Sequence, residues 1–176
     1  MIYNTKLTSH SQQLSRVLHI YESSFPIDER RDIDTFLSLI EKEEAFSVEA
    51  ICCDDRVVGF IAWWRLGEWR FVEHLAIDES MRGCGIGHEV LQRFLKENNL
   101  PVVLEVEPPT DINSCRRIAF YRSLGFELHD DYDYIQPSYS VGRKPVKLRL
   151  MSYGVGDKLD CKSVEVELHR VVYGIV

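Results

Sequence analysis

RFVEHLAIDESMRGCGIGHEVLQRFL, residues 70–95, is the stretch whose pattern decides the fold. Residues 71–76 are mostly apolar and predict a strand that enters the core. Three glycines follow, Gly83, Gly85 and Gly87, and then apolar residues at 90, 91, 94 and 95 recur at helical spacing. A strand, a glycine-rich turn and a helix in this order form an anion site, because the backbone N–H groups converge and the helix start adds unpaired donors. The pattern therefore predicts a bound phosphate or pyrophosphate.

The length and charge of the chain restrict its organisation and its partners. The 176 residues are enough for one domain with a substantial core but few for two. The formal charge of −7 argues against a nucleic-acid-binding surface, which needs a basic face to neutralise phosphates. The acidic excess suits a cationic or amine-bearing substrate. We therefore expect a single domain over residues 1–176 and no nucleic-acid partner.

No segment predicts export or a membrane anchor. The start of the chain, MIYNTKLTSHSQQ, lacks the apolar region of a signal peptide, and no apolar run approaches the ~18 residues that span a bilayer. The five cysteines are odd in number and lack a CxxC spacing, which indicates reduced thiols and no zinc framework. We expect a cytoplasmic protein with no metal and no membrane contact. The sequence leaves the oligomeric state open, a homodimer included.

Hydrophobic periodicity predicts the elements around residues 70–95. Before them we expect a strand at 1–7, a helix from a cap at Ser9 or Ser11 to about residue 24, a helix from 28 or 32 to 42, and a hairpin of strands 46–53 and 57–64. The helix after the glycines should end near Asn98-Asn99. We then expect a strand at 102–107, a helix capped at 111 or 113 and closed by Gly125, a strand from 126, a turn-rich and tyrosine-rich segment at 129–145, and a strand at 146–151. Residues 163–173 favour a helix, although 164–168 also alternate as in a strand. This order is typical of one mixed α+β domain.

Two motifs of the sequence resemble those of a known family. Arg82, Gly85 and Gly87 occupy the positions of the R/Q-x-x-G-x-G/A signature of the GCN5-related N-acetyltransferases, the GNAT family. AFYRSLGF, residues 119–126, resembles the second signature of this family, a helix that carries a tyrosine and closes on Gly-Phe. The turn is not a P-loop, because no GK[ST] follows, and it lacks the full Rossmann spacing. The resemblance covers roughly residues 51–126, and the segment 129–176 is less typical.

The resemblance implies a fold, a reaction and a set of cofactor contacts. The implied fold is α+β (mixed α/β), with a central mixed, mostly antiparallel sheet that is flanked by helices and whose parallel fourth and fifth strands splay apart. The implied reaction moves the acetyl group of acetyl-CoA to an amine, in a small molecule or a peptide, by direct attack in a ternary complex. The implied cofactor-binding residues are the amides of Arg82, Gly83, Cys84, Gly85, Ile86 and Gly87 for the pyrophosphate, the backbone of Leu75, Ala76 and Ile77 for the pantetheine arm, and Asn113.

Transfer of an acetyl group from a thioester to an amine needs a proton acceptor, an oxyanion donor and an acid for the departing thiolate. Tyr121, in the second motif, is the candidate acid, because a phenol with a pKa of about 10 can donate to a thiolate at neutral pH. Glu73, Glu105 and Glu107 are the candidate bases. Glu105 and Glu107 share one face of their strand, and Glu73 on the neighbouring strand can meet Glu105, which would raise the pKa of one of them. By the resemblance, the backbone N–H groups of residues 75–77 are the oxyanion donors.

Each assignment has a structural alternative. Tyr121 can be a core residue, and the carboxylates can bind a cation without moving protons. His74 is predicted to point away from the face of Glu73 and to pack against a helix. Several aromatic residues either wall an acceptor pocket or pack in the core, namely Trp63, Trp64, Tyr132, Tyr134, Tyr139 and Tyr153. For the whole protein, the alternatives are a non-catalytic acyl-CoA-binding or regulatory module on the same fold and a nucleotide-binding protein.

Overall fold

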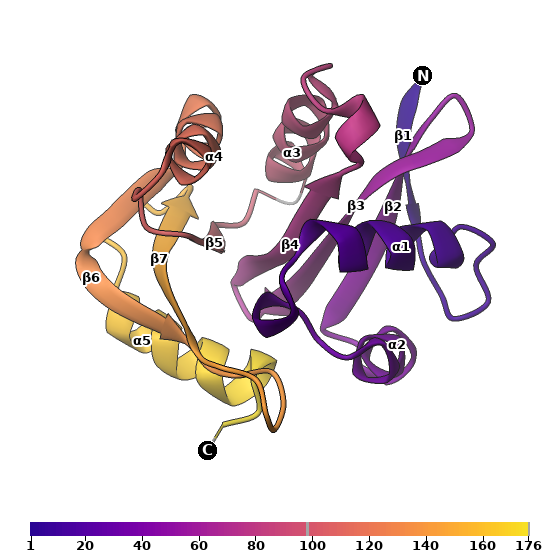
Figure 1. Ribbon diagram of the computed structural model, residues 1–176. Helices are drawn as coiled ribbons and strands as arrows, with labels where there is room; N and C mark the ends of the chain where they lie inside the picture. Colours follow the sequence, from indigo (N-terminus) through magenta and orange to yellow (C-terminus); the bar gives the residue numbers. More distant parts are fainter. Residues whose placement is uncertain (98, 176) are drawn as a thin grey trace.

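The computed structural model describes residues 1–97 and 99–175 and contains a seven-stranded sheet with helices on both faces (Figure 1). The strands are β1 Ile2–Lys6, β2 Phe46–Cys53, β3 Arg56–Leu66, β4 Trp69–Ile77, β5 Val102–Val106, β6 Glu127–Gln136 and β7 Val146–Tyr153. The helices are α1 Leu14–Ser24, α2 Ile33–Lys42, α3 Ile86–Lys96, α4 Ile112–Ser123 and α5 Cys161–Glu167. A π-helical turn, Leu168–Val172, continues α5, and short 3-10 turns lie at Ile27–Glu29 and Glu79–Met81.

The sheet has the strand order β1-β2-β3-β4-β5-β7-β6. Neighbouring strands are antiparallel at every position except β4 and β5, which run parallel. This arrangement confirms the predicted α+β fold with one parallel pair in a mostly antiparallel sheet. The predicted hairpin at 46–64 is β2 and β3, and the turn between them contains Asp54 and Asp55, both with positive φ. Acidic residues with αL backbone suit a tight turn because their short polar side chains tolerate that conformation.

The parallel strands β4 and β5 separate soon after they pair. Their register covers only three pairs, from Arg70–Val102 to Val72–Leu104. The next residue of β4 is a bulge, because Trp63 of β3 pairs with Val72 and Ala62 pairs with His74, which leaves Glu73 without an opposite residue. An extra residue bends and twists its strand. Beyond Val72, the β4 edge that faces β5 is therefore available to a ligand.

The bulge corrects the prediction for His74. In a regular strand His74 would point away from the face of Glu73, but His74 Nδ1 lies 4.0 Å from Glu73 Oε1, on the face covered by α1. The other part of the prediction is confirmed, because the His74 ring packs against Tyr21 and Phe25, with ring centroids 4.9 and 4.5 Å away. The extra residue shifts the alternation of β4, and two consecutive side chains share one side of the sheet.

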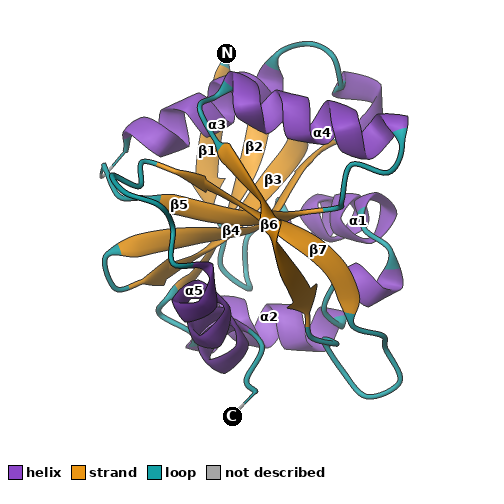
Figure 2. Cartoon of the chain, turned by 90° about the vertical axis from the view of Figure 1, so that its left-hand side faces the viewer, coloured by secondary structure: helices purple, strands orange, loops and turns teal. Residues whose placement is uncertain are grey.

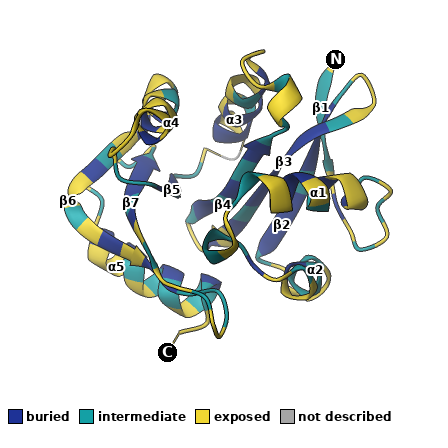
Figure 3. Ribbon diagram, viewed as in Figure 1, coloured by how far each residue is buried: buried dark blue, intermediate teal, exposed yellow. Residues whose placement is uncertain are grey.

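Helices α3 and α4 cover one face of the sheet, and α1, α2 and α5 lie on the other (Figure 2). Buried residues run along the sheet and along the sides of the helices that face it (Figure 3). Helix α3 buries the four residues predicted from its periodicity, Val90, Leu91, Phe94 and Leu95. It ends at Lys96, close to the predicted end near Asn98-Asn99, of which Asn98 lies outside the described residues.

Two predicted local structures differ from the observed ones. Helix α1 begins at Leu14, not near Ser9 or Ser11, because the Ser11 hydroxyl accepts a hydrogen bond from the Thr8 N–H and closes a separate turn at 2.9 Å. The first part of the tyrosine-rich segment 129–145 is strand, since β6 extends to Gln136. Acidic residues alternate there with buried positions, which suits a strand at the edge of the sheet. The C-terminal helix is confirmed as α5 and its π-helical extension.

Candidate active site

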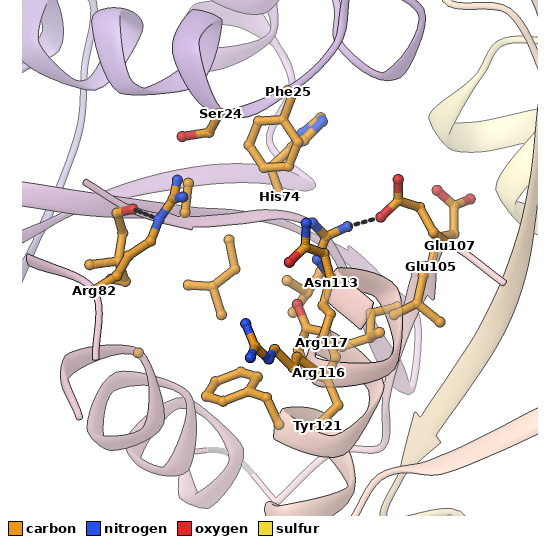
Figure 4. A pocket seen from close by; sticks show the side chains of 18 of the residues that line it. Ser24, Phe25, His74, Arg82, Glu105, Glu107, Asn113, Arg116, Arg117 and Tyr121 are labelled. Atoms are coloured by element: carbon orange, nitrogen blue, oxygen red, sulfur yellow. Dashed lines mark hydrogen bonds and ion pairs between the residues drawn. The ribbon is translucent and has the colours of Figure 1, made fainter. Parts of the chain in front are cut away.

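A cavity of about 920 Å³ lies where β4 and β5 separate, and it brings most of the predicted site residues together (Figure 4). On the side of α3 and α4 it is lined by the glycine-rich turn, the end of β4 and α4. On the side of α1 it is lined by residues 24, 25 and 29 and by side chains of β4 to β7 and of the loop after β6. The cavity therefore passes through the opening between the two strands and is reached from both faces of the sheet.

The glycine-rich turn has the backbone conformation that an anion site needs. Gly83 and Gly85 both have φ of +78°, which L side chains rarely adopt, and Gly85 is the N-cap of α3. A Cβ atom at either position would meet nothing within 4 Å, so the requirement is conformational and not steric. Arg82 is held across the base of the turn, because its Nε donates to the Ile77 carbonyl at 3.0 Å (Figure 4). The start of α3, with Gly85, Ile86 and Gly87, thus lines the cavity.

Nearly all of the predicted cofactor-binding residues line the cavity. They are Leu75, Ala76, Ile77, Arg82, Gly83, Gly85, Ile86, Gly87 and Asn113. Cys84, the remaining predicted residue, is exposed and does not line the cavity. It belongs to the glycine-rich turn only by its place in the chain between Gly83 and Gly85. The groups that fit a CoA molecule are the αL glycines, the free edge of β4 beyond Val72 and the start of α3.

Helix α4 brings Tyr121 and Asn113 to the cavity wall. Its start is fixed by Asp111, whose side chain accepts hydrogen bonds from the N–H groups of Asn113 and Ser114, while Ser114 completes a capping box. Tyr121 is buried against Phe126, with ring centroids 5.6 Å apart, and burial raises its pKa to about 12. Tyr121 is therefore a protonated phenol at neutral pH, as its predicted role requires.

Glu73 is an ionised carboxylate with a full set of donors. Arg31 Nε lies 2.9 Å from its Oε1, Trp64 Nε1 lies 2.6 Å from its Oε2, and the Tyr139 hydroxyl donates to Oε1 at 2.9 Å. Its side chain has no exposed surface. Burial opposes ionisation, but the Arg31 guanidinium and the donors from Trp64 and Tyr139 outweigh burial and lower the pKa of Glu73. Its charge is thus balanced in place by Arg31.

Glu105, the next carboxylate across the parallel pair, has different partners. Its hydrogen bonds come from two tyrosine hydroxyls, Tyr134 on β6 and Tyr173 after the π-helical turn. Burial raises the pKa of Glu105 to about 7, while these two hydroxyls act in the opposite direction and the nearby charge of Glu73 adds to the rise. Two carboxylates on neighbouring strands therefore differ in charge state near neutral pH, because one faces a guanidinium and the other faces phenols.

The cavity has further acidic groups on the side of α1. Burial, and then the charge of Glu107, raises the pKa of Glu29. Glu107 itself pairs with Arg117 of α4 (Figure 4). The backbone carbonyl of Glu29 accepts a hydrogen bond from His74 Nε2 at 2.9 Å, and burial lowers the pKa of His74, so this imidazole is neutral. The cavity is therefore lined by four carboxylates, those of Glu29, Glu73, Glu105 and Glu107.

Sequence reasoning missed several residues that shape this side of the site. Arg31 precedes α2, Tyr173 lies near the chain end, and Phe25 and Gln136 line the cavity from distant segments. None carries a local signal, because each reaches the site only through tertiary packing. Of the tyrosines and tryptophans predicted as possible pocket walls, Tyr139 lines the cavity. Trp64 and Tyr134 do not line it but donate hydrogen bonds to Glu73 and Glu105, respectively.

Residues 1–97 and 99–175 contain no group of three or more His, Cys, Asp or Glu side chains placed to hold a metal ion. Within the same ranges, no helix has both the length and the apolar character to cross a bilayer.

Comparison with known proteins gives consistent matches. The profile of the acetyltransferase (GNAT) domain matches residues 43–128. A GNAT-family protein from Bacteroides thetaiotaomicron is 32% identical, with a TM-score of 0.92, and the match covers 99% of both chains. The Bacillus subtilis protein YjbC is 32% identical over 73 residues, which are 40% of this chain and only 38% of that protein. The structure of Arabidopsis thaliana Naa50 with the bisubstrate analogue CoA-Ac-MVNAL has 20% identity and a TM-score of 0.62, covers 88% of this chain and 99% of that chain, and so shares the fold. The Bacteroides match extends over essentially the full length of both proteins at this identity, and the chain belongs to the GNAT family of acetyltransferases.

Proposed function

We propose that the protein transfers the acetyl group of acetyl-CoA to the amine of a cationic acceptor that enters from the side of α1. The observation that carries this proposal is the single cavity between β4 and β5, lined on one side by an anion-binding turn and on the other by carboxylates. When bound, acetyl-CoA supplies the reactive thioester. The bound CoA analogue of Naa50, a protein that shares this fold, supports the choice of donor.

Each side of the cavity has a separate task in this proposal. The amides of residues 82–87 hold the pyrophosphate, and the edge of β4 at residues 75–77 pairs with the pantetheine arm as an added strand would. The backbone N–H groups of that edge stabilise the charge that develops on the thioester oxygen. Tyr121 gives its proton to the departing sulfur, which a phenol with a pKa of about 12 can do without having ionised beforehand.

We assign the proton acceptor to Glu105 and not to Glu73. A base for an ammonium group works best with a pKa close to the operating pH, and the pKa of Glu105 is about 7. Glu73 remains ionised but already accepts hydrogen bonds from three side chains, so it has little capacity for another proton. Because Arg31 balances its charge, Glu73 instead holds Arg31 and Tyr139 in place on this side of the cavity. Glu29 adds acidic character on the same side of the cavity.

The test is release of CoA from acetyl-CoA in the presence of a panel of amines, with Tyr121→Phe as the variant and Tyr153→Phe as its matched control. Both tyrosine rings lie 5.6 Å from Phe126, but only Tyr121 lines the cavity. We expect Tyr121→Phe to lower kcat by roughly 10²-fold or more and Tyr153→Phe to leave it near the wild-type value. Equal losses in the two variants would refute the role of Tyr121.

A second measurement addresses the alternative functions. Thermal-shift assays should show stabilisation by acetyl-CoA and CoA and none by ATP or NAD. Tight binding of acetyl-CoA without turnover on any amine would favour the non-catalytic acyl-CoA-binding module. Stabilisation by ATP or NAD alone would contradict the proposal.

A further inference from the structure

The C-terminal end of the chain contacts the carboxylate that we propose as the base. Helix α5 continues into the π-helical turn Leu168–Val172, and the Tyr173 N–H bonds to the Leu168 carbonyl at 3.1 Å. Leu168 and Val172 are buried in the core on the side of α1. The turn therefore directs Tyr173 inward, and its hydroxyl lies 2.9 Å from Glu105 Oε1 and 2.8 Å from Oε2. π-Helical turns of this kind occur frequently at functional sites.

The position of Tyr173 is fixed from several directions. Arg31 Nη2 donates to the Val172 carbonyl at 2.8 Å, in a fully buried contact. The same guanidinium binds Glu73 through Nε, so one arginine joins the two carboxylate sites. The Tyr173 ring packs against Tyr139, with centroids 5.3 Å apart. The hydroxyl of Tyr173 is thus held on Glu105 by contacts from the segment before α2 and the loop after β6.

The two oxygens of Glu105 have unequal surroundings. Oε1 lies within hydrogen-bond distance of two hydroxyls, those of Tyr134 and Tyr173. Among the described residues, Oε2 has one hydrogen-bond donor, the Tyr173 hydroxyl. Because a tyrosine hydroxyl has a single proton, Tyr173 cannot donate fully to both oxygens at once. Oε2 therefore retains the greater capacity to accept a proton from an amine in the cavity.

We propose that Tyr173 is a positioning residue of the active site: with Tyr134 it orients the Glu105 carboxylate so that Oε2 faces the acceptor amine. This inference rests on the proposed function of Glu105. It assigns a task to the C-terminal segment, of which residues 154–175 contribute nothing to the lining of the cavity. Tyr173 and Tyr134 donate hydrogen bonds to Glu105 and affect the reaction only through this carboxylate.

The same contacts should set the pH at which Glu105 gains and loses its proton. Titratable and charged groups face it from every element packed around it, namely Tyr134 of β6, Tyr173, Glu73 of β4, Arg31 before α2 and Tyr139 of the loop after β6. Hydrogen bonds from Tyr173 and Tyr134 favour the ionised form and lower the pKa of Glu105 against the effect of burial. Loss of one hydroxyl should therefore raise that pKa.

The decisive experiment compares Tyr173→Phe with Tyr132→Phe. Tyr132 is a matched control, because its hydroxyl also bonds a carboxylate, that of Glu165 on α5, at 2.6 Å, but away from the cavity. Tyr173→Phe should move the acidic limb of the kcat/KM profile to higher pH by about one unit, with recovery at high pH. Tyr132→Phe should keep the wild-type profile. A uniform loss at every pH in Tyr173→Phe would show a merely structural role and overturn the inference.

A second readout does not require activity. Titration of the Glu105 carboxyl by ¹³C NMR, in protein with labelled glutamate and no ligand, should give a higher pKa in Tyr173→Phe than in the wild type. Tyr134→Phe removes the other donor and should shift the titration in the same direction, which keeps the test decisive if Tyr173→Phe folds poorly. An unchanged titration in both variants would overturn the inference even if acetyl transfer is intact. A shifted titration in a protein that acetylates no amine would support the hydrogen-bond assignment and refute the proposed function.

Discussion

Replacing Glu105 by glutamine should make the protein more stable at pH 8 while it removes most of the activity. Both effects come from the carboxylate of Glu105, which is buried and accepts hydrogen bonds only from tyrosine hydroxyls. Its charge is costly in the folded protein, and the same group is the proposed base. Glutamine has nearly the same shape and keeps an oxygen for the two tyrosine hydroxyls. The substitution therefore removes the charge and leaves the packing of β5 in place.

The magnitude follows from the pKa of Glu105. In the folded protein that pKa is about 7, above the value of 4.5 expected for the unfolded chain. Below pH 4.5 the carboxyl is protonated in both states and causes no loss of stability. Between pH 4.5 and 7 the unfolded state releases a proton that the folded state keeps, so the free energy of unfolding falls as pH rises. At 1.36 kcal/mol per unit the full loss is about 3 kcal/mol, and it is complete above pH 7.

The assay is urea denaturation of the wild type and Glu105→Gln at pH 5 and pH 8. The stability difference between the two proteins should be larger at pH 8 by about 2 to 3 kcal/mol, with the lower part of this range favoured because Glu105 borders a cavity that water can enter. Other titrating groups are common to both proteins and cancel in the comparison. At neutral pH the rate of acetyl transfer should fall by roughly 10² to 10⁴, the usual contribution of a general base.

The control for this experiment is Glu127→Gln, at the exposed start of β6. It removes a carboxylate that faces solvent and should give the same pH dependence of unfolding as the wild type. If the Glu105→Gln and wild-type stabilities differ by the same amount at both pH values, Glu105 is ionised like an ordinary carboxylate. The argument for Glu105 as a base near neutral pH would then fail.

Two further predictions concern the turn and the buried ion pair. Gly85→Ala should destabilise the protein by about 1 to 2 kcal/mol, because φ is +78° there, and should weaken acetyl-CoA binding in calorimetry. Gly67→Ala, at φ +58° in the turn between β3 and β4, should cost similar stability without changing that binding, and equal binding losses would contradict the anion-site assignment. Arg31→Met should lower the stability by about 3 kcal/mol or more, because it leaves the buried Glu73 carboxylate without its cation. Adding Glu73→Gln to Arg31→Met should restore part of this loss in urea denaturation, and no recovery would show that the pairing with Glu73 is not the cause.

The fold was largely predictable because its signals are local. Residues 70–95 contain a strand, αL glycines and an amphipathic helix in sequence, and each of these is set by neighbours within a few positions. The hairpin β2–β3 and the capped helix α4 have equally local causes. The start of α1 was predicted too early, because Ser11 serves a turn with Thr8 and does not cap the helix. A serine hydroxyl can either cap a helix or close a turn, and the residue types alone do not show which of the two forms.

The gathering of the predicted cofactor-binding residues around one cavity was predictable to the same degree, whereas the surroundings of the carboxylates were not. The predicted residues of the turn, of β4 and of α4 line one cavity, except Cys84. The charge states of Glu73 and Glu105 depend on Arg31, Tyr139 and Tyr173, which lie 42 or more positions away from the carboxylates that they contact. No pattern in the sequence joins them. The bulge at Glu73 is a second example, because it depends on how β3 pairs with β4 and it changes the face on which His74 lies.

The two carboxylates also explain why the less typical segments of the chain matter. Strands β4 and β5 place Glu73 and Glu105 side by side, and a symmetric pair of this kind would share one proton. The symmetry is broken by groups from outside the central motif: Arg31, before α2, fixes a negative charge on Glu73, and Tyr173, beyond α5, gives Glu105 only a neutral donor. In the proposed function, the common core of the fold holds the donor and supplies both carboxylates. The segments before α2 and after β5 decide which of them can take a proton, and so they are where the choice of acceptor amine should be determined.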